Sequence, residues 1–371
     1  MRYTVLSAAY PLAQVGPDAV GGAEQILTAL DRALVKAGHN SLVIAAEGSQ
    51  VAGTFIASPK SGGKLDDAAR LEAQRAHAQL IRRALARFRV DLLHMHGLDF
   101  HRYLPEADVP VLATIHLPPD FYPRSIFSGR RRRLYLNSVS SSQRKACPRR
   151  APSIDNGVEV SQFEWQSGER PYAFALGRIC PEKGFHFALD AARLADVDLL
   201  LAGEVFPYAW HQEYFAREIV PRLDSRRRFI GPVGFREKKR LLARARCLLV
   251  PSTVAETSSL VAMEALASGT PVIAFPSGAL AEIVGHGRTG YLVSNTAEMA
   301  QAISASGAID PRACRRAAEV RFSAAAMFEG YIALYRRILL KEARFLEVQT
   351  LARNTRLRTA SNEREGRRRR F

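Results

Sequence analysis

Two cations and two carboxylates in the second half of the chain have the types and spacing to bind a phosphorylated, hydroxyl-rich ligand. Arg178 and Lys183 lie on either side of a short loop, and Glu256 and Glu264 stand eight positions apart in "ETSSLVAME". Two cations on one loop can clamp a diphosphate and neutralise charge that develops on a leaving group. A carboxylate can accept a hydrogen bond from each of two neighbouring hydroxyls, as in a ribose diol. By spacing alone, the two cations are equally compatible with a solvated surface.

The two glutamates occupy different parts of one strand-to-helix unit. "CLLVPS" is expected to be a buried strand, and a hydroxyl residue at 257–259 can cap the helix that runs through "LVAMEALAS" to Gly269. Glu256 therefore lies in the loop at the positive end of this helix. Glu264 lies more than one turn inside it, where a buried carboxylate needs a partner.

A pair of glycines precedes the first predicted helix. Gly21 and Gly22 stand in "PLAQVGPDAVGGAEQ", after an apolar strand-like run. A helix N-terminus behind paired glycines lets backbone N–H groups approach a phosphate closely. The loop does not match G-x-G-x-x-G, so an ordinary turn remains the alternative.

Alternating apolar strands and helices predict two doubly wound α/β domains, 1–165 and 166–325. Short apolar strands separated by helices imply parallel sheets that are covered on both faces. Ligands of such sheets bind beyond the carboxyl ends of the strands, so a cleft between the domains is the expected site. The predicted strands are 3–9, 41–46, 90–96, 110–116 and 134–140, then 172–177, 197–203, 227–232, 247–252, 271–275 and 290–293; the predicted helices are 23–38, 65–88, 185–195, 236–246 and 259–268.

The composition is that of a globular protein with two domains. The chain has 371 residues, of which 47% are hydrophobic and 24% charged. The sequence contains no run of eighteen apolar residues, so no transmembrane helix is expected. The short apolar run at the N-terminus is interpreted as a strand and not as a signal peptide. Four scattered cysteines indicate reduced thiols and no metal site. His94 and His96 alternate along a predicted strand, so they are expected on opposite faces and not as a metal pair.

A formal net charge of +17 indicates an anionic partner. Basic residues cluster at 130–133, 143–150, 226–228 and 236–246 and in the last thirty residues. Phosphorylated ligands, acidic lipid surfaces and nucleic acids are all attracted by a positively charged surface. The alternative is that the charge reflects only an arginine-rich composition and serves no anionic partner. Because no nucleic-acid-binding motif is present, nucleic acid is not the expected partner. Residues 346–371 lack apolar periodicity and are predicted to be a basic, disordered tail.

The full set of motifs closely resembles the retaining glycosyltransferases of family 4, also called glycosyl transferases group 1. The resemblance spans about residues 1–340 and rests on "GGAEQ", "VDLLHMHG", "TIHLP", "DNGVEVSQF", "GRICPEKGF", "LLVPS" and E-x7-E followed by "ALASGTPVIAFPSGALAEIVGHGRTGYLV". It implies the GT-B fold, with two facing Rossmann-like domains, a cleft between them and a C-terminal helical extension. In that fold the helix at 326–345 is expected to pack back on the N-terminal domain.

The resemblance also implies roles for individual residues. It makes the N-terminal domain the acceptor side and the C-terminal domain the nucleotide-sugar side. Glu264 would hold the ribose hydroxyls, and Gly21 and Gly22 would close over the phosphates. The implied catalytic residues are Arg178, Lys183, Glu256 and His116, and the implied donor-binding residues are Gly21, Gly22, Ser258, Ser259, Leu260 and Glu264. His116, at the end of a predicted strand, is by its sequence equally compatible with a structural role.

One departure from the family pattern concerns the donor sugar. The usual loop reads E-x-F-G-L-V, whereas Ser258 and Ser259 stand here in place of Phe and Gly. Sugar specificity therefore does not carry over. The resemblance implies a nucleotide-diphospho-sugar as co-substrate, with UDP- or GDP-sugar preferred, no metal and no other cofactor. Expected partners are a saccharide or lipid-linked acceptor and an anionic membrane surface, with a cytoplasmic location that extends to the inner face of the membrane.

Other functions remain open from the sequence. A GT-B fold epimerase or phosphorylase would use similar phosphate chemistry, although no lysine motif for a pyridoxal cofactor is apparent. A non-catalytic nucleotide-sugar-binding module is a second class, and a nucleic-acid-binding protein is a third. The presence of Arg178, Lys183, Glu256 and Glu264 together argues for an active enzyme.

Overall fold

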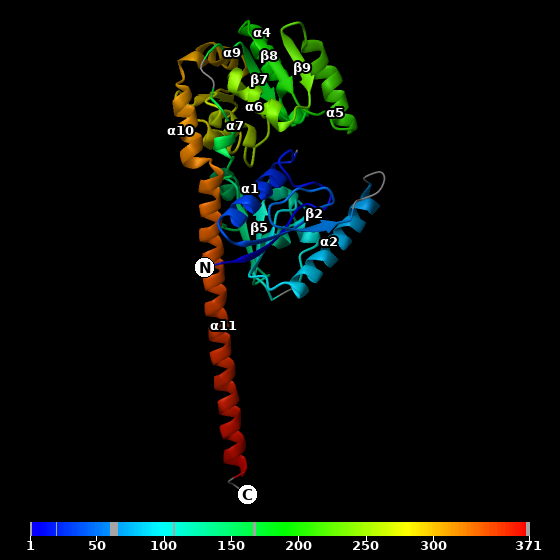
Figure 1. Ribbon diagram of the computed structural model, residues 1–371, viewed down its shortest axis with the longest axis vertical. Coiled ribbons are helices and arrows are strands. Elements are labelled where there is room, and N and C mark those ends of the chain that lie inside the picture. Colours follow the sequence, from blue (N-terminus) through cyan, green and yellow to red (C-terminus); the bar gives the residue numbers. More distant parts are fainter. Residues whose placement is uncertain (1, 20, 60–65, 107, 166–167, 369–371) are drawn as a thin grey trace.

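The computed structural model contains two six-stranded parallel sheets, each within its own domain (Figure 1). It describes all residues except 1, 20, 60–65, 107, 166–167 and 369–371. The strand orders are β3-β2-β1-β4-β5-β6 in the N-terminal sheet and β12-β11-β10-β7-β8-β9 in the C-terminal sheet. Both orders reverse after the first strand in sequence, which is the doubly wound arrangement that the sequence predicted.

The N-terminal domain contains every strand that the sequence predicted there and one that it did not. Its elements are β1 (Thr4–Ala8), α1 (Gly22–Lys36), β2 (Asn40–Ala46), β3 (Thr54–Ser58), α2 (Asp67–Arg87), β4 (Leu92–Met95), β5 (Val111–Ile115), β6 (Leu134–Ser138) and α3 (Ser141–Ala146). The additional strand, β3, forms the edge of the sheet, and most of its side chains are exposed. An exposed edge strand lacks the buried apolar run by which the others were found.

The C-terminal domain likewise contains all six predicted strands. Its elements are β7 (Tyr172–Leu176), α4 (Phe185–Leu194), β8 (Asp198–Ala202), α5 (Ala209–Tyr214), β9 (Arg227–Gly231), α6 (Phe235–Arg244), β10 (Ala245–Val250), α7 (Leu260–Ala267), β11 (Val272–Ala274), α8 (Leu280–Ile283), β12 (Gly290–Leu292), α9 (Thr296–Ala305) and α10 (Pro311–Arg321). Successive strand residues point to opposite faces. Leu248 therefore packs in the core under α6 and α7, and Leu249 packs in the core under α4 and α9.

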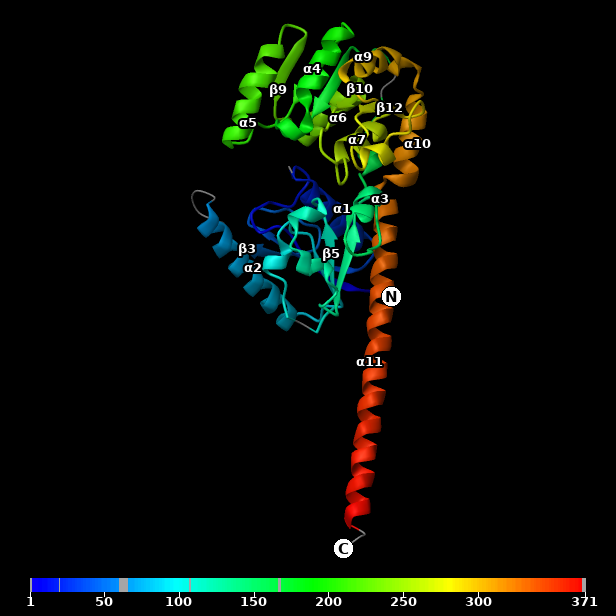
Figure 2. The same ribbon diagram turned by 180° about the vertical axis from the view of Figure 1, so that it is seen from behind.

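The chain crosses between the domains twice, and the two crossings are hydrogen-bonded to each other. The N–H of Val158 donates to the carbonyl of Phe322 at 2.8 Å, and the N–H of Ala324 donates back to Val158 at 2.8 Å. The second crossing leads into α11 (Ala324–Arg368), which lies along the N-terminal domain against α1 (Figures 1 and 2). Tyr331 and Tyr335 of α11 are fully buried in the core that α1 and β1 share.

Helix α11 extends beyond the globular body, where the sequence predicted a disordered tail from residue 346. In the structure the helix continues to Arg368 (Figure 2). The segment 346–368 contains no proline and has its single glycine at position 366, and alanine, leucine, arginine and glutamate are good helix formers. Helix propensity therefore accounts for the difference, although the segment shows no amphipathic pattern. None of the helices in the described part of the chain is long and apolar enough to cross a membrane.

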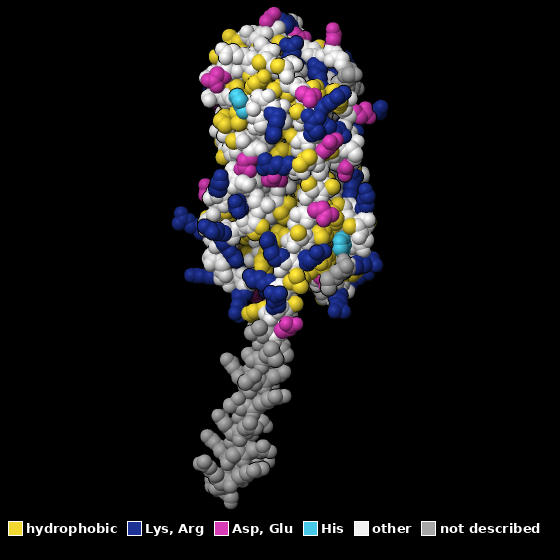
Figure 3. All heavy atoms as spheres, turned by 90° about the vertical axis from the view of Figure 1, so that its left-hand side faces the viewer, with side chains coloured by type: hydrophobic (Ala, Val, Ile, Leu, Met, Phe, Trp, Pro, Cys, Tyr) yellow, Lys and Arg dark blue, Asp and Glu magenta, His cyan; other side chains and the backbone are white. Residues whose placement is uncertain are grey.

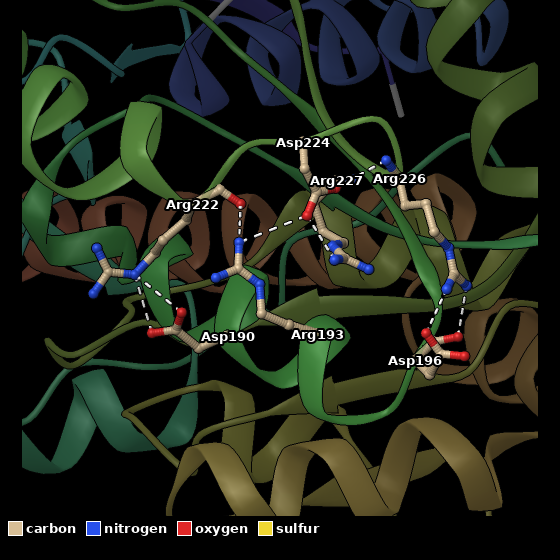
Figure 4. Close-up of polar contacts among 7 residues, drawn as sticks. All are labelled: Asp190, Arg193, Asp196, Arg222, Asp224, Arg226 and Arg227. Atoms are coloured by element: carbon tan, nitrogen blue, oxygen red, sulfur yellow. Dashed lines mark hydrogen bonds and ion pairs between the residues drawn. The ribbon is translucent and has the colours of Figure 1, made fainter.

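An ion-pair network at the amino ends of β8 and β9 neutralises one of the basic clusters (Figure 4). Arg226 donates to Asp198 at 2.7 Å, and Arg227 donates to Asp224 at 2.6 Å. The network comprises Asp190, Arg193, Asp196, Arg222, Asp224, Arg226 and Arg227, together with Asp198. Two of the three arginines at 226–228 thus have aspartate partners, and this run offers less free positive charge than its sequence indicated.

Candidate functional site

The cation loop and the carboxylate loop lie side by side because β7 and β10 are neighbouring parallel strands. The cation loop ends in the short 3-10 turn Pro181–Lys183. The next residue, Gly184, has φ +64°, and a Cβ built on it would lie 2.2 Å from the carbonyl oxygen of Pro251 at the end of β10. Only glycine fits this close approach, so the turn that carries Lys183 is fixed against the β10 loop.

Lys183 and Glu256 form an ion pair at the carboxyl edge of the sheet. The Nζ atom of Lys183 lies 2.6 Å from Oε1 of Glu256, and the hydroxyl of Ser252 donates to the same oxygen at 2.5 Å. The two charged side chains are 26% and 13% exposed, so a ligand can still reach them. Charge-assisted hydrogen bonds of this kind fix both geometry and orientation. The sequence predicted both charged residues for the site but not their pairing, and it did not single out Ser252.

Arg178 lies just beyond β7 on the same loop and is exposed. Its carbonyl accepts from the thiol of Cys180, but its side chain has no hydrogen-bond or ion-pair partner among the described residues. Its guanidinium group is therefore free to bind an anion at this edge of the sheet.

Helix α7 begins directly after the carboxylate loop, as the sequence predicted. Ser259 is the N-cap residue, with an extended backbone and no capping hydrogen bond from its side chain, and Leu260 is the first helical residue. The first backbone N–H groups of a helix have no acceptor within it. The Oγ atom of Ser258 is buried and has no hydrogen-bond partner among the described residues. The start of α7 thus presents unpaired donors at the site.

Glu264 is buried in α7 and has a partner that the sequence analysis did not identify. Its Oε1 atom lies 2.5 Å from Nζ of Lys238 on α6, and the two side chains are 5% and 13% exposed. Burial raises the pKa of Glu264, and the charge of Lys238 opposes that rise. Glu264 also lines a cavity of about 540 Å³ between the domains, together with Leu260, Phe235 and residues of α1.

The glycine pair lies at the start of α1, facing the start of α7. A Cβ built on Gly22 would lie 3.5 Å from a methyl carbon of Leu260, so the two helix N-termini are in contact range across the domain boundary. Gly21 is the N-cap residue, and a Cβ there would lie 1.9 Å from a carboxylate oxygen of Glu24. Burial raises the pKa of Glu24, which the sequence analysis did not single out.

His116 connects the N-terminal domain to the carboxylate loop. It directly follows β5, and its carbonyl accepts a hydrogen bond from the hydroxyl of Thr257, the neighbour of Glu256, at 2.9 Å. Its Nε2 atom lies 3.3 Å from Nδ1 of His96. Burial lowers the pKa of His116 to about 4, so its ring is neutral at pH 7.

The expectation that His94 and His96 point to opposite faces is wrong. Their ring centroids lie 3.9 Å apart. Residues two positions apart in an extended chain lie on the same face, so the expectation misapplied the alternation of side chains, and the two rings lie beside each other at the end of β4. Burial lowers the pKa of both rings well below its ordinary value. In the described residues, no group of three or more His, Cys, Asp or Glu side chains is placed to hold a metal ion.

The structure therefore gathers most of the predicted residues around one edge of the second sheet. It adds residues that the sequence analysis did not assign to the site: Glu24, His96, Lys238 and Ser252. The partners of Lys238 and His96 are 26 and 20 residues away in the chain, so no local pattern indicated them. The combination supplies the unpaired guanidinium group of Arg178, the paired Lys183 and helix amides for an anion, and carboxylates and a neutral imidazole for hydroxyl groups.

Two family profiles match the chain, one in each domain. The family described as "Glycosyltransferase Family 4" matches residues 20–151, and the family described as "Glycosyl transferases group 1" matches residues 170–306. A phosphatidyl-myo-inositol mannosyltransferase of Mycolicibacterium smegmatis is 27% identical over 310 residues, which cover 74% of this chain and 78% of that protein.

Solved glycosyltransferase structures share the fold. AviGT4, a glycosyltransferase involved in avilamycin A biosynthesis, superimposes with a TM-score of 0.71 and 24% identity, covering 91% of this chain and 98% of that one. HepE from Anabaena, solved in complex with UDP-glucose, superimposes with a TM-score of 0.70 and 18% identity, covering 91% and 100%. At these identities the likeness establishes the arrangement of two facing Rossmann-like domains.

Proposed function

Because the chain belongs to the glycosyltransferases of family 4, we propose that it moves a sugar from a nucleotide-diphospho-sugar to a hydroxyl acceptor with retention of the anomeric configuration. The observation that carries this proposal is the convergence of Lys183, Glu256 and the start of α7 at the edge of the GT-B fold's second sheet. A cation, a carboxylate and free helix amides at one place suit a ligand that carries both phosphate and hydroxyl groups.

The diphosphate of the donor occupies the cationic side of this site. Arg178, Lys183 and the first backbone N–H groups of α7 surround it and stabilise the negative charge that grows as the bond between the sugar carbon and the phosphate oxygen breaks. Lys183 is held by Glu256 in the free protein. When Lys183 turns to the diphosphate, the carboxylate of Glu256 becomes available to the hydroxyls of the transferred sugar.

The ribose of the donor contacts Glu264, and the transferred sugar contacts His116. Glu264 lines the interdomain cavity, so a nucleoside in that cavity reaches its carboxylate. The ribose hydroxyls then share that carboxylate with Lys238. His116 is neutral at pH 7, so its imidazole can donate one hydrogen bond and accept another without adding charge beside the cationic sugar of the transition state.

Retention requires the acceptor to arrive on the face from which the diphosphate leaves. The acceptor oxygen forms a bond to the sugar carbon, and the electron pair of the broken bond stays on the departing diphosphate. The proton of the acceptor hydroxyl moves to an oxygen of that phosphate. We expect EDTA to leave the reaction unchanged, because Arg178, Lys183 and the helix amides balance the charge of the diphosphate.

A thermal-shift experiment with UDP-, GDP- and ADP-sugars tests donor binding and identifies the base. A ligand at a hundredfold excess over its Kd stabilises the native state by about 2.7 kcal/mol, or on the order of 5 to 11 °C for a domain of this size. We expect such a shift with a UDP- or GDP-sugar. The anomeric configuration of the product is then read by NMR, and an inverted product or a donor epimer formed without acceptor contradicts the proposal.

Substitution of Lys183 and Glu256 tests the assignment of the site. Lys183→Ala and Glu256→Ala should each lower kcat by about a hundredfold or more, as the loss of a transition-state contact does. Lys145→Ala, which removes an exposed lysine on α3, is the matched control and should keep full activity. Full activity in either site variant refutes the assignment.

We also propose a peripheral position at an anionic membrane surface. Lys and Arg side chains gather on the lower part of the face that α11 forms (Figure 3). A second cavity, of about 750 Å³, lies between α11 and β6. Its charged lining residues are Arg131, Arg132, Arg133 and Lys341 together with Glu106, Asp108 and Glu342, and Arg133 pairs with the last two. Anionic lipids attract such basic surfaces in a salt-dependent manner.

Deletion of residues 353–371 tests the contribution of the basic tail to membrane binding. We expect weaker co-sedimentation with phosphatidylglycerol vesicles at low salt and unchanged transfer to a water-soluble acceptor. The same vesicle binding with and without the tail contradicts the role of this segment.

A further inference from the structure

An exposed pair of aromatic rings follows β8, close to the cation loop but outside the site described above. Tyr208 and Trp210 are 54% and 47% exposed. Their ring planes are within 14° of parallel, and their centroids lie 6.2 Å apart. Phe206 lies 6.2 Å from Tyr208 at the inner end of the group. We call Phe206, Tyr208 and Trp210 the aromatic platform.

His211 packs against the aromatic platform on its buried side. It is fully buried, and its ring meets Trp210 edge-on at 4.0 Å and Tyr208 edge-on at 5.3 Å between centroids. Edge-to-face contacts of this kind hold the ring orientations before any ligand binds. Neither nitrogen of His211 has a hydrogen-bond partner in the described part of the chain, which is a costly arrangement for a buried imidazole.

The loop that carries the platform is fixed to the loop that carries Arg178. The N–H of Ile179 donates to the carbonyl of Glu204 at 3.0 Å. Gly203 has φ +150°, and a Cβ built on it would lie 1.8 Å from the carbonyl oxygen of Gly177. Burial lowers the pKa of His211, and the charge of Arg178 lowers it further.

The platform faces the N-terminal domain. Helix α5, which begins at Ala209 within the platform, lies on the same side of the molecule as α2 in both views (Figures 1 and 2).

From this geometry we propose that the aromatic platform binds a neutral pyranose ring of the acceptor saccharide, an inference that rests on the proposed function. The C–H face of a pyranose is apolar and packs flat on an aromatic ring, while its hydroxyl groups point outward to polar neighbours. Tyr208 and Trp210 offer two nearly parallel faces for that contact. Exposed Glu204 and Arg178, on the two hydrogen-bonded loops beside the platform, provide polar groups for the hydroxyls.

The strand order favours an acceptor over the donor as the occupant. Along the edge of the sheet, the ends of β10, β7 and β8 follow one another. Glu256 and α7 lie at β10, Arg178 and Lys183 lie at β7, and the platform lies at β8. The donor occupies the first two positions, so a sugar at β8 lies beyond its diphosphate.

Fluorescence of Trp210 tests binding at the platform directly. The chain has two tryptophans, so Trp165→Phe leaves Trp210 as the sole reporter. We titrate this variant with mannotriose, maltotriose and chitotriose in the presence of the stabilising nucleotide, and expect a saturable change with at least one of them. The saccharide that binds then serves as the acceptor in kinetic assays.

In those assays, Trp210→Ala should raise the acceptor KM by on the order of tenfold and leave the donor KM unchanged, because it removes one stacking contact. Trp210→Phe retains a ring and should recover most of that loss. Trp165→Ala removes the other partly exposed tryptophan and is the matched control.

The outcomes separate this inference from the proposed function. If nucleotides bind but no saccharide alters Trp210 fluorescence, or if Trp210→Ala leaves the acceptor KM unchanged, the platform is not an acceptor site. If Trp210→Ala instead loses binding to phosphatidylglycerol vesicles alone, the rings contact lipid and the inference is wrong. If no nucleotide stabilises the protein, it is the proposed function that fails.

Discussion

Replacing Lys238 with methionine should destabilise the C-terminal domain and make its stability depend on pH. In the native protein, Nζ of Lys238 lies 2.5 Å from the carboxylate of Glu264, and both side chains are buried to more than four-fifths. Methionine has a similar length and fills the same space, so the substitution removes mainly the charge. The carboxylate of Glu264 is then left in an apolar environment without its counterion.

The size of the effect follows from the burial of the pair. Removing one partner of a buried ion pair costs about 3 to 5 kcal/mol, because the remaining charge has lost both water and counterion. For a domain of this size, about 1 kcal/mol corresponds to a change in Tm of 2 to 4 °C. The melting temperature of Lys238→Met should therefore fall by about 6 to 20 °C at neutral pH.

The pH dependence has a definite sign. Burial already raises the pKa of Glu264 in the native protein, and Lys238 opposes that rise. Without Lys238 the pKa in the folded state rises further, so the folded state binds a proton that the unfolded state has released. Stability of the variant then falls as pH rises above the ordinary pKa of a glutamate. The loss relative to the native protein should be largest near pH 8 and smallest near pH 5.

Differential scanning fluorimetry of four proteins at these two pH values measures the effect. The double variant Lys238→Met/Glu264→Gln has no buried charge and should regain most of the loss. Arg240→Met breaks an exposed ion pair with Glu237 on the same helix and should leave the melting temperature unchanged. A melting temperature of Lys238→Met equal to that of the native protein at both pH values would refute the buried, ionised pair.

Three further predictions concern the backbone, the domain contact and acid stability. Gly184→Ala places a Cβ 2.2 Å from the carbonyl of Pro251, so it should displace the Lys183 turn and weaken donor binding in the thermal-shift assay; an unchanged donor shift contradicts the tight turn. Thr257→Val removes the hydrogen bond to the carbonyl of His116 and should lower the free energy of unfolding in urea by about 1 kcal/mol; an unchanged free energy of unfolding contradicts this contact. Burial lowers the pKa of His116 and of His77 to about 4, below the value of about 6.5 expected in the unfolded chain. The free energy of unfolding should therefore be highest above about pH 6.5 and decline as the pH falls from there toward about 4. A Tm that does not change over this pH range contradicts the burial of these rings.

The sequence allowed the fold to be predicted almost completely, because its strands are short apolar runs with helices between them. All predicted strands are present, and the strand at 54–58 was missed because an edge strand with exposed side chains has no apolar run. The segment 346–368 is a helix that the sequence analysis did not predict. Amphipathic periodicity is absent beyond residue 346, yet helix propensity alone continues α11 to Arg368.

The candidate site was predictable where its residues lie next to a strand end or a helix start. Arg178, Lys183 and Glu256 follow strands, and parallel strands end at one edge of the sheet, so their convergence could be expected from the topology. The error over His94 and His96 was one of reasoning and not of missing information, because residues two apart in a strand share a face, and the structure places the two rings together.

Which partner each charge has was decided by the tertiary structure. Lys238 is 26 residues from Glu264 in the chain, and Lys183 is 73 residues from Glu256, yet each pair is in hydrogen-bonding contact. The stacked rings of Tyr208 and Trp210 became a candidate site only when the β8 loop was seen beside Arg178. Local patterns determine strands, helices and their order because those depend on neighbouring residues. Pairings across loops and domains depend on how the sheets pack, and a single sequence carries no periodic signal for them.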